Sequence, residues 1–345
     1  MELVDLRSDT VTQPTPAMRD AMAVARVGDD VFQEDPTINQ LQEKSAQLMG
    51  KEAGLFVPSG TMGNLLAVLS HCQRGEEAMM GTQGHTFLFE GGGISALGGV
   101  FPHTLVNQAD GSLALADIEA AIRPNDVHQP SSKLLILENT QNRCGGVVLS
   151  PEYTKQAAKL VHNHGIKLHI DGARIFNAAV ALGIEARELV KDADSVTFCL
   201  SKGLCAPVGS VLCGDAEFIQ RARHLRKMLG GGMRQAGVLA AAGIVALDQQ
   251  VKLLAADHVR AKRLAEGLAG IPGIQFEMGM PQTNMVFPSL TAEVRASAAD
   301  IAKKLAAEDI RIGVVGERKF RMVTHYWISD EGVERTIAAM GKALK

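Results

Sequence analysis

Short apolar runs alternate with longer stretches of helical spacing through the first two thirds of the chain. The apolar runs occupy residues 54–57, 133–137, 167–170 and 195–200. Unbroken β-rich runs are typical of strands that are buried on both faces, and the stretches between them are typical of helices. The alternation therefore predicts an α/β fold, in which a mostly parallel sheet is covered by helices.

The N-terminal segment has a different pattern. Residues 1–13 are predicted to form an extended arm. A short helix is expected from Pro16 to about Val24, because proline is favoured at the first helical positions. The Asp35-Pro36 pair marks the start of a second helix in the same way.

A long helical stretch from about Met233 to Leu268 separates the alternating part from a shorter pattern of strands and helices. This shorter pattern predicts a smaller α+β domain, and the boundary is expected within residues 235–275. We place a large domain, with the N-terminal arm, at residues 1–250 and a small C-terminal domain at residues 251–345. A length of 345 residues is typical of about two domains.

Composition and charge exclude several classes of partner. Hydrophobic residues make up 46% of the chain, so a sizeable core is expected. The formal net charge is -3, and neither sign is concentrated in a stripe or a tail. Aromatic residues make up only 4%, too few to build a stacking surface for single-stranded nucleic acid. We therefore expect neither a nucleic-acid partner nor a membrane partner.

The five cysteines are scattered, and none forms a Cys-x-x-Cys pair. This usage predicts reduced core thiols in a cytosolic protein. The N-terminus has an early acidic residue and no apolar run, which argues against a signal peptide. No stretch approaches the roughly 18 apolar residues of a membrane-spanning helix. The predicted location is the cytoplasm.

Ligands of parallel sheets gather at the carboxyl ends of the strands, so side chains just after the strands are candidates for chemistry. Lys202 follows the apolar run 195–200. Burying an ammonium there is costly, and a lysine with a lowered pKa can form an imine with an aldehyde. The alternative is a lysine whose amine simply extends from a strand end into solvent.

Asp171 ends the run 167–170, and Arg174 follows within one turn. A carboxylate at this position could keep a pyridine nitrogen protonated, and the arginine could donate to a phenolic oxygen or to a substrate carboxylate. The alternative is a helix-capping aspartate beside a surface arginine. His169 shares a strand face with Asp171, but no third ligand has suitable spacing, so no metal site is predicted.

Ser59, Gly60 and Thr61 lie where a strand turns into a helix. Small residues let the backbone approach an anion, and a helix N-terminus offers free N–H groups, so these residues are a candidate phosphate site. The motif alone is weak. It becomes much more specific because Asp171 and Lys202 follow it in the chain.

The sequence closely resembles the low-specificity L-threonine aldolases, a branch of the fold-type I pyridoxal-phosphate enzymes. The resemblance covers essentially the whole chain. Its strongest stretches are Asp5-Leu-Arg-Ser-Asp-Thr-Val-Thr12, Gly28-Asp-Asp-Val31, Ser59-Gly-Thr-Met-Gly-Asn64, His169-Ile-Asp-Gly-Ala-Arg-Ile-Phe-Asn177, Leu200-Ser-Lys-Gly203, Gly230-Gly-Gly-Met-Arg-Gln235 and Arg321-Met-Val-Thr-His325.

The resemblance implies a role in cofactor binding for four places in the chain. Lys202 would be the Schiff-base lysine, and Asp171 would pair with the pyridine nitrogen. The Ser59-Gly60-Thr61 turn would hold the phosphate, helped by Arg234 from a neighbouring subunit. The cofactor expected from the resemblance is therefore pyridoxal 5'-phosphate.

The resemblance also implies contacts with an amino-acid substrate. His85 would stack on the cofactor ring, and His128 would face the β-hydroxyl side of the pocket. Ser8, Arg174 and Arg321 would bind the substrate carboxylate. The alternatives are solvated loop histidines, a helix-capping serine and surface arginines. Either histidine could accept the β-hydroxyl proton because imidazole titrates near neutral pH, and a water in the pocket is a third candidate.

Two positions depart from the pattern of many relatives. Phe32 stands where the Gly-Asp-Asp-Val motif is often followed by tyrosine. If that hydroxyl touches the cofactor or substrate, its loss alters affinity or selectivity at the β-carbon. Gln141 stands where histidine is common, which puts any role of the loop after Glu138 in doubt.

The activity implied by the resemblance is the cleavage of L-threonine, L-allo-threonine and related β-hydroxy-α-amino acids to glycine and an aldehyde. An alternative on the same scaffold is a β-eliminating lyase or an aminotransferase. A non-catalytic protein that keeps the scaffold for ligand binding is a third hypothesis. The family is usually tetrameric, so the resemblance implies a homotetramer with active sites at subunit interfaces.

Overall fold

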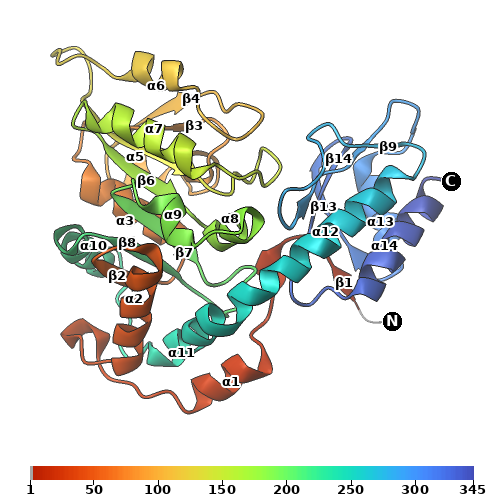
Figure 1. Cartoon of the computed structure of the whole chain (residues 1–345), viewed down its shortest axis with the longest axis horizontal. Coiled ribbons are helices and arrows are strands. Elements are labelled where there is room, and N and C mark those ends of the chain that lie inside the picture. The colour runs from red at the N-terminus through yellow and green to blue at the C-terminus, as the bar shows by residue number, and fades with distance from the viewer. Residues whose placement is uncertain (1–2) are drawn as a thin grey trace.

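The computed structural model describes residues 3–345 and has two lobes joined by a long helix (Figure 1). The large lobe contains a seven-stranded sheet with the order β2-β8-β7-β6-β5-β3-β4. Its strands are β2 (Ala53–Val57), β3 (Glu77–Gly81), β4 (Phe101–Leu105), β5 (Ser132–Glu138), β6 (Lys167–Asp171), β7 (Ser195–Cys199) and β8 (Ser210–Gly214). Only β8 runs antiparallel to its neighbours, so the predicted mostly parallel α/β fold is confirmed.

Helices lie on both faces of this sheet (Figure 1). They are α1 (Pro16–Ala23), α2 (Pro36–Met49), α3 (Gly60–His71), α4 (His85–Leu88), α5 (Gly93–Ala96), α6 (Leu115–Ala121), α7 (Pro151–His162), α8 (Ile175–Leu182), α9 (Ala186–Val190) and α10 (Ala216–Met228), with short 3-10 turns at Asp9–Val11 and Asp30–Phe32. The strands predicted from the apolar runs correspond to β2, β5, β6 and β7. The pattern did not predict β3, β4 or β8, although β3 and β8 are buried throughout.

The start of α3 is fixed by its sequence. Ser59 caps the helix, because its hydroxyl accepts a hydrogen bond from the Met62 backbone N–H at 3.2 Å. The glycines at its N-terminal end let the helix approach β7 closely. A Cβ atom on Gly63 would lie 2.5 Å from Thr197 Cγ2, and one on Gly60 would lie 2.9 Å from Cys199 Sγ. Larger residues at these positions would push the helix start away from the sheet.

A continuous helical stretch, Gly237–Ala269, joins the two lobes (Figure 1). It comprises α11 (Gly237–Val245), a π-helical turn (Ala246–Gln250), a 3-10 turn (Val251–Leu253) and α12 (Leu254–Ala269). By length and composition it could cross a membrane, contrary to the expectation that no stretch reaches that length. In the fold α11 packs against α1 and α2, and α12 packs against α8 and α14, as core helices do.

The small lobe is an α+β unit with antiparallel strands in the order β10-β14-β11-β9, with β13 also paired to β14. Its elements are β9 (Ile274–Gln275), β10 (Met285–Val286), β11 (Ser289–Leu290), α13 (Ala298–Ala306), β12 (Ile310–Arg311), β13 (Gly313–Gly316), β14 (Lys319–Val323) and α14 (Asp330–Ala343). The predicted arm departs from expectation here. Its strand β1 (Val4–Asp5) pairs with β12, so Val4 packs in the core of the small lobe. Residues 1 and 2 of the predicted arm lie outside the described residues.

The cores of the two lobes are separate. The main core of the large lobe ends at Leu254, and the core of the small lobe resumes the chain at Ala261. Both residues lie within α12, inside the range expected for the boundary. All five cysteines in the part of the chain that is described are free, and Cys144 is the only one of them that is not fully buried.

Candidate active site

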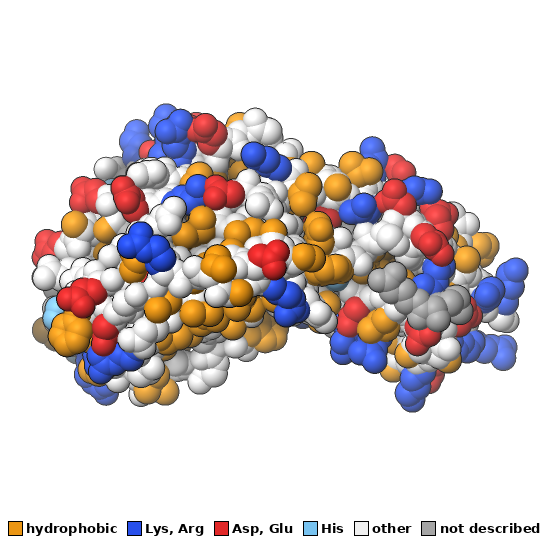
Figure 2. All heavy atoms as spheres, turned by 90° about the horizontal axis from the view of Figure 1, so that it is seen from below, with side chains coloured by type: hydrophobic (Ala, Val, Ile, Leu, Met, Phe, Trp, Pro, Cys, Tyr) orange, Lys and Arg blue, Asp and Glu red, His pale blue; other side chains and the backbone are white. Residues whose placement is uncertain are grey.

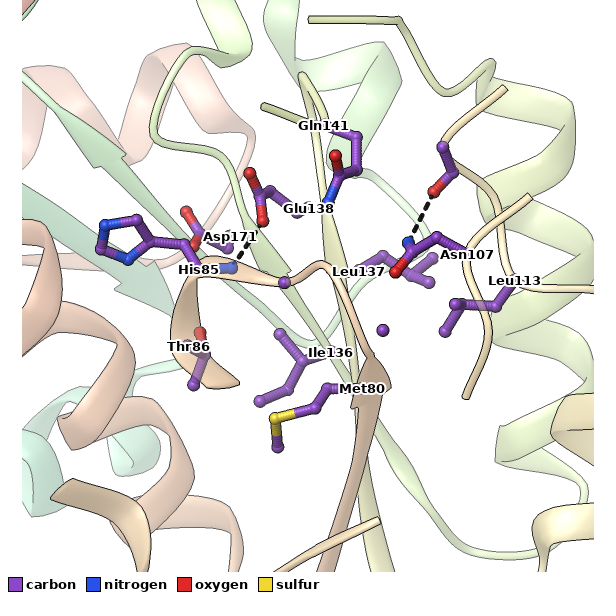
Figure 3. Close-up of a pocket in the computed structure, with 13 residues that line it drawn as sticks. Met80, His85, Thr86, Asn107, Leu113, Ile136, Leu137, Glu138, Gln141 and Asp171 are labelled. Carbon is purple, nitrogen blue, oxygen red and sulfur yellow. Dashed lines mark hydrogen bonds between the residues drawn. The ribbon is translucent and has the colours of Figure 1, made fainter. Parts of the chain in front are cut away.

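The carboxyl ends of β5, β6 and β7 meet at one edge of the large sheet. Glu138 ends β5 and lies opposite Asp171 at the end of β6, and Lys202 follows β7. Figure 3 shows Glu138, Asp171 and His85 side by side at one end of a pocket. The structure therefore brings Glu138, Asp171 and His85 together although they are far apart in the sequence. Parallel strands end at the same edge of the sheet, which explains why these residues meet there.

Asp171 is buried and accepts hydrogen bonds on both carboxylate oxygens. The Asn64 side chain donates to Oδ2 at 2.9 Å, and the Ala173 backbone N–H donates to Oδ1 at 3.2 Å. Asn64 also donates to Oε1 of Glu90 at 2.8 Å. One amide from α3 thus joins two carboxylates, and it leaves the edge of Asp171 available to a cationic ring nitrogen.

His85 lies at the start of α4 and is held by two acidic groups. Its Nδ1 is 2.8 Å from Oε1 of Glu90. Its backbone N–H donates to Oε2 of Glu138 at 2.8 Å (Figure 3). The hydrogen bond to Glu90 raises the pKa of His85 above its usual value. About a third of the side chain remains exposed, so one face of the ring is open to the pocket.

Glu138 has an unusual environment for a carboxylate. Burial, followed by the negative charge of Asp171, raises its pKa to about 7. Among residues 3–345, its two oxygens accept hydrogen bonds only from backbone groups, those of His85 and Asn142. Glu138 therefore fixes the backbone that carries His85, in addition to lining the pocket.

Lys202 is half-buried, and its charge interacts with the charges of Asp9 and His85. Its backbone carbonyl accepts a hydrogen bond from the Thr12 hydroxyl at 2.8 Å. The N-terminal arm thereby fixes the turn that carries the lysine. The charges of Lys202 and Asp171 both act on His85, so the lysine lies near the sheet edge where these groups meet. Its role as the Schiff-base lysine stays a prediction.

Arg174 and Arg321 approach one another from different lobes. Arg174 is buried and donates from Nε and Nη2 to the two oxygens of Asp9, at 2.7 and 2.5 Å. Burial, together with the charge of Arg174, lowers the pKa of Arg321 to about 10. The buried Nε of Arg321 has no protein partner among the described residues. Such an unsatisfied cationic donor fits an anionic ligand.

Ser8 lies at the start of the first 3-10 turn, where its hydroxyl caps Thr10. Arg321 donates to the carbonyl of Arg7 at 3.2 Å, so the arm and the small lobe meet beside Arg174. The contact brings Arg321 next to the neighbour of Ser8, whereas the shared binding of a substrate carboxylate by Ser8 and Arg321 stays a prediction.

Arg234 and Phe32 lie at the exposed margin of the large lobe. Arg234 forms an ion pair with Asp29 at 2.9 Å, and 54% of its side chain is exposed. Phe32 is 70% exposed. The structure therefore does not bring Arg234 to the Ser59 turn within one chain, and its action from a neighbouring subunit stays a prediction.

His128 lies on an exposed loop, where it pairs with Asp126 at 2.7 Å. Its side chain is 85% exposed and lines a shallow surface depression beside Phe101, away from the pocket of Figure 3. Within one chain the structure does not bring His128 to Asp171 and Lys202, so it faces a β-hydroxyl group only if another chain receives it. The loop is polar and rich in turn residues, which explains why it stays in solvent.

The sequence patterns gave no role to Asn64, Glu90 and His169, although all three are buried at the site. A signal did exist. Asn64 lies in an apolar helix and His169 in an apolar strand, and a polar residue in such a run is expected to have a buried partner. Periodicity cannot identify that partner, because it comes from a distant element.

The donor set fits pyridoxal phosphate. Lys202 can hold its aldehyde carbon, Asp171 can accept from the ring nitrogen, and the N-terminus of α3 offers N–H groups for the phosphate. His85, Glu90 and Asp171 also have ligand atoms within 4.8 Å of one another, as a metal site would. Asn64 already joins one oxygen of each carboxylate in a hydrogen-bonded network, and we interpret this cluster as part of the cofactor site.

Comparisons with known proteins agree with this interpretation. The family model described as Beta-eliminating lyase matches residues 5–291. The chain is 49% identical to a probable low-specificity L-threonine aldolase 2 of Arabidopsis thaliana, over 98% of this chain and 96% of that protein. It is 46% identical to the low specificity L-threonine aldolase of Escherichia coli K12, over 97% and 98%. A threonine aldolase structure from Leishmania major has the same fold, with a TM-score of 0.83 at 22% identity over 99% of this chain and 100% of that chain.

Proposed function

Because the chain belongs to the threonine aldolases of the beta-eliminating lyase family, we propose that the site at the carboxyl edge of the large sheet cleaves L-threonine to glycine and acetaldehyde with pyridoxal phosphate. The observation that supports it best is that the charges of Lys202 and Arg321 both act on Asp9, and those of Lys202 and Asp171 both act on His85, so the three groups lie near one another. Lys202 can hold the cofactor covalently, Asp171 can pair with its protonated ring nitrogen, and Arg321 can bind an amino-acid carboxylate.

One chain offers the covalent, ring-nitrogen and helix N-terminal contacts that the cofactor would need. Lys202 would hold the aldehyde carbon, and Asp171 would pair with the protonated ring nitrogen. Ser59, Gly60 and Thr61 at the start of α3 bind the phosphate through backbone N–H groups. When bound, the cofactor supplies a cationic ring that can accept the electron pair of the broken Cα–Cβ bond.

Arg321 orients the substrate. Its side chain donates to the Arg7 carbonyl, and its buried Nε has no acceptor in the described part of the chain. Arg174 adds positive charge from beneath, although Asp9 already occupies two of its donors. Ser8 completes the carboxylate pocket from the arm. A substrate held at this end presents its β-hydroxyl group to the opposite, more exposed side of the pocket.

The cleavage requires a group that accepts the proton of the β-hydroxyl as the aldehyde leaves. His85 is the candidate that the chain itself places in the pocket, with Nδ1 bound to Glu90 and Nε2 available. His128 can serve only if a second copy of the chain delivers it. A water held in the pocket is the third candidate.

Incubation of the purified holoenzyme with L-threonine tests the proposed reaction. Glycine and acetaldehyde in equal amounts are expected. Formation of 2-oxobutyrate would instead indicate dehydration, and a requirement for an amino acceptor would indicate transamination. Bound cofactor without turnover of any β-hydroxy amino acid would overturn the proposal and favour a non-catalytic protein. Comparison with L-allo-threonine, and with the D-isomers as controls, defines the preference at the β-carbon.

We propose in addition a homotetramer in the cytoplasm, with active sites at the subunit interfaces. Figure 2 shows hydrophobic side chains gathered on the face of the large lobe that carries α1 and α11. Val24, Val27 and Val238 are among the exposed apolar residues there. Apolar patches of this kind favour association, and Arg234 and His128 are the polar residues that a second chain would use. Sedimentation of the holoenzyme measures the oligomeric state.

A further inference from the structure

A continuous series of hydrogen bonds connects Asn64, which contacts Asp171, with the last residue of the same helix, α3. The series passes through side chains of β6 and β7. His169 on β6 has Nε2 at 3.2 Å from Asn64 Oδ1 and Nδ1 at 2.9 Å from Ser195 Oγ. Ser195 Oγ in turn is 2.8 Å from Nε2 of His71, the last residue of α3. His169 and Ser195 are fully buried. The pocket and the substrate contacts described above use none of these last three residues.

The chemistry of the groups fixes the direction of every hydrogen bond. The two carboxylates that Asn64 faces accept only, so its nitrogen points to Asp171 and Glu90 and its oxygen must point to His169. Because that oxygen cannot donate, Nε2 of His169 carries the hydrogen. A neutral imidazole then has a bare Nδ1, which accepts from the Ser195 hydroxyl.

Burial keeps this line uncharged. It lowers the pKa of His169 to about 3 and the pKa of His71 to about 4, so both rings are neutral near pH 7. The ring of His71 stacks on Phe218 with centroids 4.4 Å apart, which holds it in place. The His71 Nε2–H therefore donates to Ser195, and all the hydrogen bonds run in one direction toward Asp171.

We propose that His169 and Ser195 are positioning residues, which lock the Asn64 amide so that it donates to Asp171 and thereby keep the ring nitrogen of the cofactor protonated. This inference rests on the proposed function. If the Asn64 amide were free to rotate, its oxygen could face the carboxylates and repel them. With two N–H groups donating to it, the Asp171 carboxylate is held in one orientation, and its remaining lone pairs can accept a hydrogen bond from the ring nitrogen.

Other charged groups near Asp171 do not take over the hydrogen bond that Asn64 donates to it. Glu138 on β5, Glu90 before α5 and His85 on α4 lie at the pocket side, and Lys202 follows β7. Of these, Glu90 shares the Asn64 amide, and Glu138 is bound to backbone N–H groups. The only side-chain donor to Asp171 in the described part of the chain is Asn64. Control of its amide orientation therefore controls the partner of the ring nitrogen.

Two isosteric variants of His169 separate a positioning role from a merely structural one. The amide nitrogen of glutamine lies near the place of imidazole Nε2, so His169→Gln keeps the donor to Asn64. Asparagine reaches only the place of Nδ1, so His169→Asn keeps the contact to Ser195 and loses the donor. Both variants are polar and place an amide in the same cavity. Thermal melting of each holoenzyme shows that it is folded.

The first readout is the pH dependence of the visible absorbance of the bound cofactor, measured without substrate. A ring without its positive charge makes the Lys202 nitrogen easier to protonate, so the midpoint is expected to rise by about one unit in His169→Asn. His169→Gln is expected to keep the wild-type midpoint. Ser195→Ala, which removes one hydroxyl and frees the imidazole tautomer, is expected to shift the midpoint in the same direction by less.

The second readout separates kcat from KM for L-threonine. In His169→Asn, kcat is expected to fall about tenfold while KM stays within about twofold, because the carboxylate pocket is untouched. Unchanged midpoints in both His169→Asn and Ser195→Ala, or equal damage in His169→Gln and His169→Asn, would overturn the proposal. A wild-type enzyme that makes no glycine from L-threonine would overturn the proposed function instead. The absorbance titration would still test whether His169 and Ser195 fix the Asn64 amide.

Discussion

The buried floor of the site and its exposed rim differ in how completely one chain builds them. We define the floor as the buried residues Asp9, Asn64, His169, Asp171 and Arg174, which are joined by direct hydrogen bonds in two groups. These residues come from the arm, α3, β6 and the turn after it. Within the described chain, the polar partners of the floor are already in place, so its geometry does not depend on another subunit.

The rim consists of Phe32, His128 and Arg234, and it is solvent-exposed in one chain. The exposed fractions are 70% for Phe32, and 85% and 54% for the side chains of His128 and Arg234. Folding of one chain therefore fixes the groups that would act on the cofactor ring. The groups that would act on the far side of the substrate need a second subunit to reach it. The expected effects below test that division.

Removal of Lys202, which stands above the floor, has the largest expected effect. Lys202→Ala deletes the group that holds the cofactor covalently, so turnover is expected to fall by roughly 10⁴-fold or more. The visible absorbance of the covalently held cofactor is expected to disappear with it. Acetaldehyde release and the absorption spectrum measure the two effects. The exposed control Lys191→Ala, which breaks only a surface pair with Glu188, should match the wild type. Turnover retained by Lys202→Ala would remove the basis of the assignment.

Asp9→Asn removes the buried ion pair of the floor, because it leaves Arg174 buried without its counter-ion. The expected cost is about 3–5 kcal/mol of unfolding free energy, as for other broken buried pairs. Glu188→Gln is the control, because its pair with Lys191 is exposed and is expected to contribute under about 1 kcal/mol. Chemical denaturation at pH 7 measures both. Equal losses in the two variants would contradict the distinction between floor and surface.

The same pair gives a pH dependence with a definite sign. Burial alone would raise the pKa of Asp9, but the charge and hydrogen bonds of Arg174 lower it well below its ordinary value. Its contribution to stability is therefore complete above the ordinary aspartate pKa and is lost as the pH falls below about 4. In Asp9→Asn this part of the acid sensitivity should be missing, which denaturation series at several pH values would detect.

Arg321 lies between floor and rim and binds the substrate carboxylate in the proposed function. Arg321→Leu is expected to lower kcat/KM for L-threonine by about 10²–10³-fold, since a charged hydrogen-bonding partner of the substrate is lost. Steady-state kinetics measures the change, and the cofactor spectrum should be unchanged. Arg335→Leu serves as a control on α14, away from the pocket of Figure 3. An unaltered kcat/KM would place the carboxylate elsewhere.

His128 tests whether the rim acts between subunits. His128→Ala is expected to lower kcat/KM by about 10–100-fold if its imidazole accepts the β-hydroxyl proton. The exposed His164→Ala is the control. Steady-state kinetics of both variants decides whether the exposed loop has a function.

Mixed oligomers sharpen this test. When His128→Ala and Lys202→Ala chains are unfolded and refolded together, some sites receive an intact Lys202 from one chain and an intact His128 from the other. Measurable recovery of turnover relative to either variant alone is expected if His128 acts across the interface. No recovery, despite formation of mixed oligomers, would show that the rim does not complete a neighbouring site.

Phe32→Tyr has the smallest expected effect. It restores the hydroxyl of many relatives at an exposed position, so kcat is expected to change by less than about threefold, within about 0.7 kcal/mol. A change in the ratio of L-threonine to L-allo-threonine cleavage is expected if the ring reaches a substrate in the assembled protein. Phe101→Tyr, on the exposed surface of β4, is the control.

The fold class, and the places in the chain where cofactor-binding groups are expected, could be predicted from the sequence alone. Apolar runs predict buried strands, and residues that directly follow parallel strands share an edge of the sheet, so Asp171 and Lys202 could be placed together without a structure. The turn at Ser59 was identifiable for the same reason, since its chemistry is local to one strand-helix junction. The resemblance to relatives then gave the cofactor and the reaction.

Tertiary structure decided which side chains pair with those groups. Asn64 and Asp171, or Asp9 and Arg174, are joined by contacts between elements far apart in the chain, and no local pattern encodes such a pairing. Only the fold showed that β1 of the arm packs in the small lobe and that His128 stays outside the pocket of its own chain. Hydrophobic periodicity specifies which face of an element is buried, but the partner of a buried polar group depends on how distant elements pack.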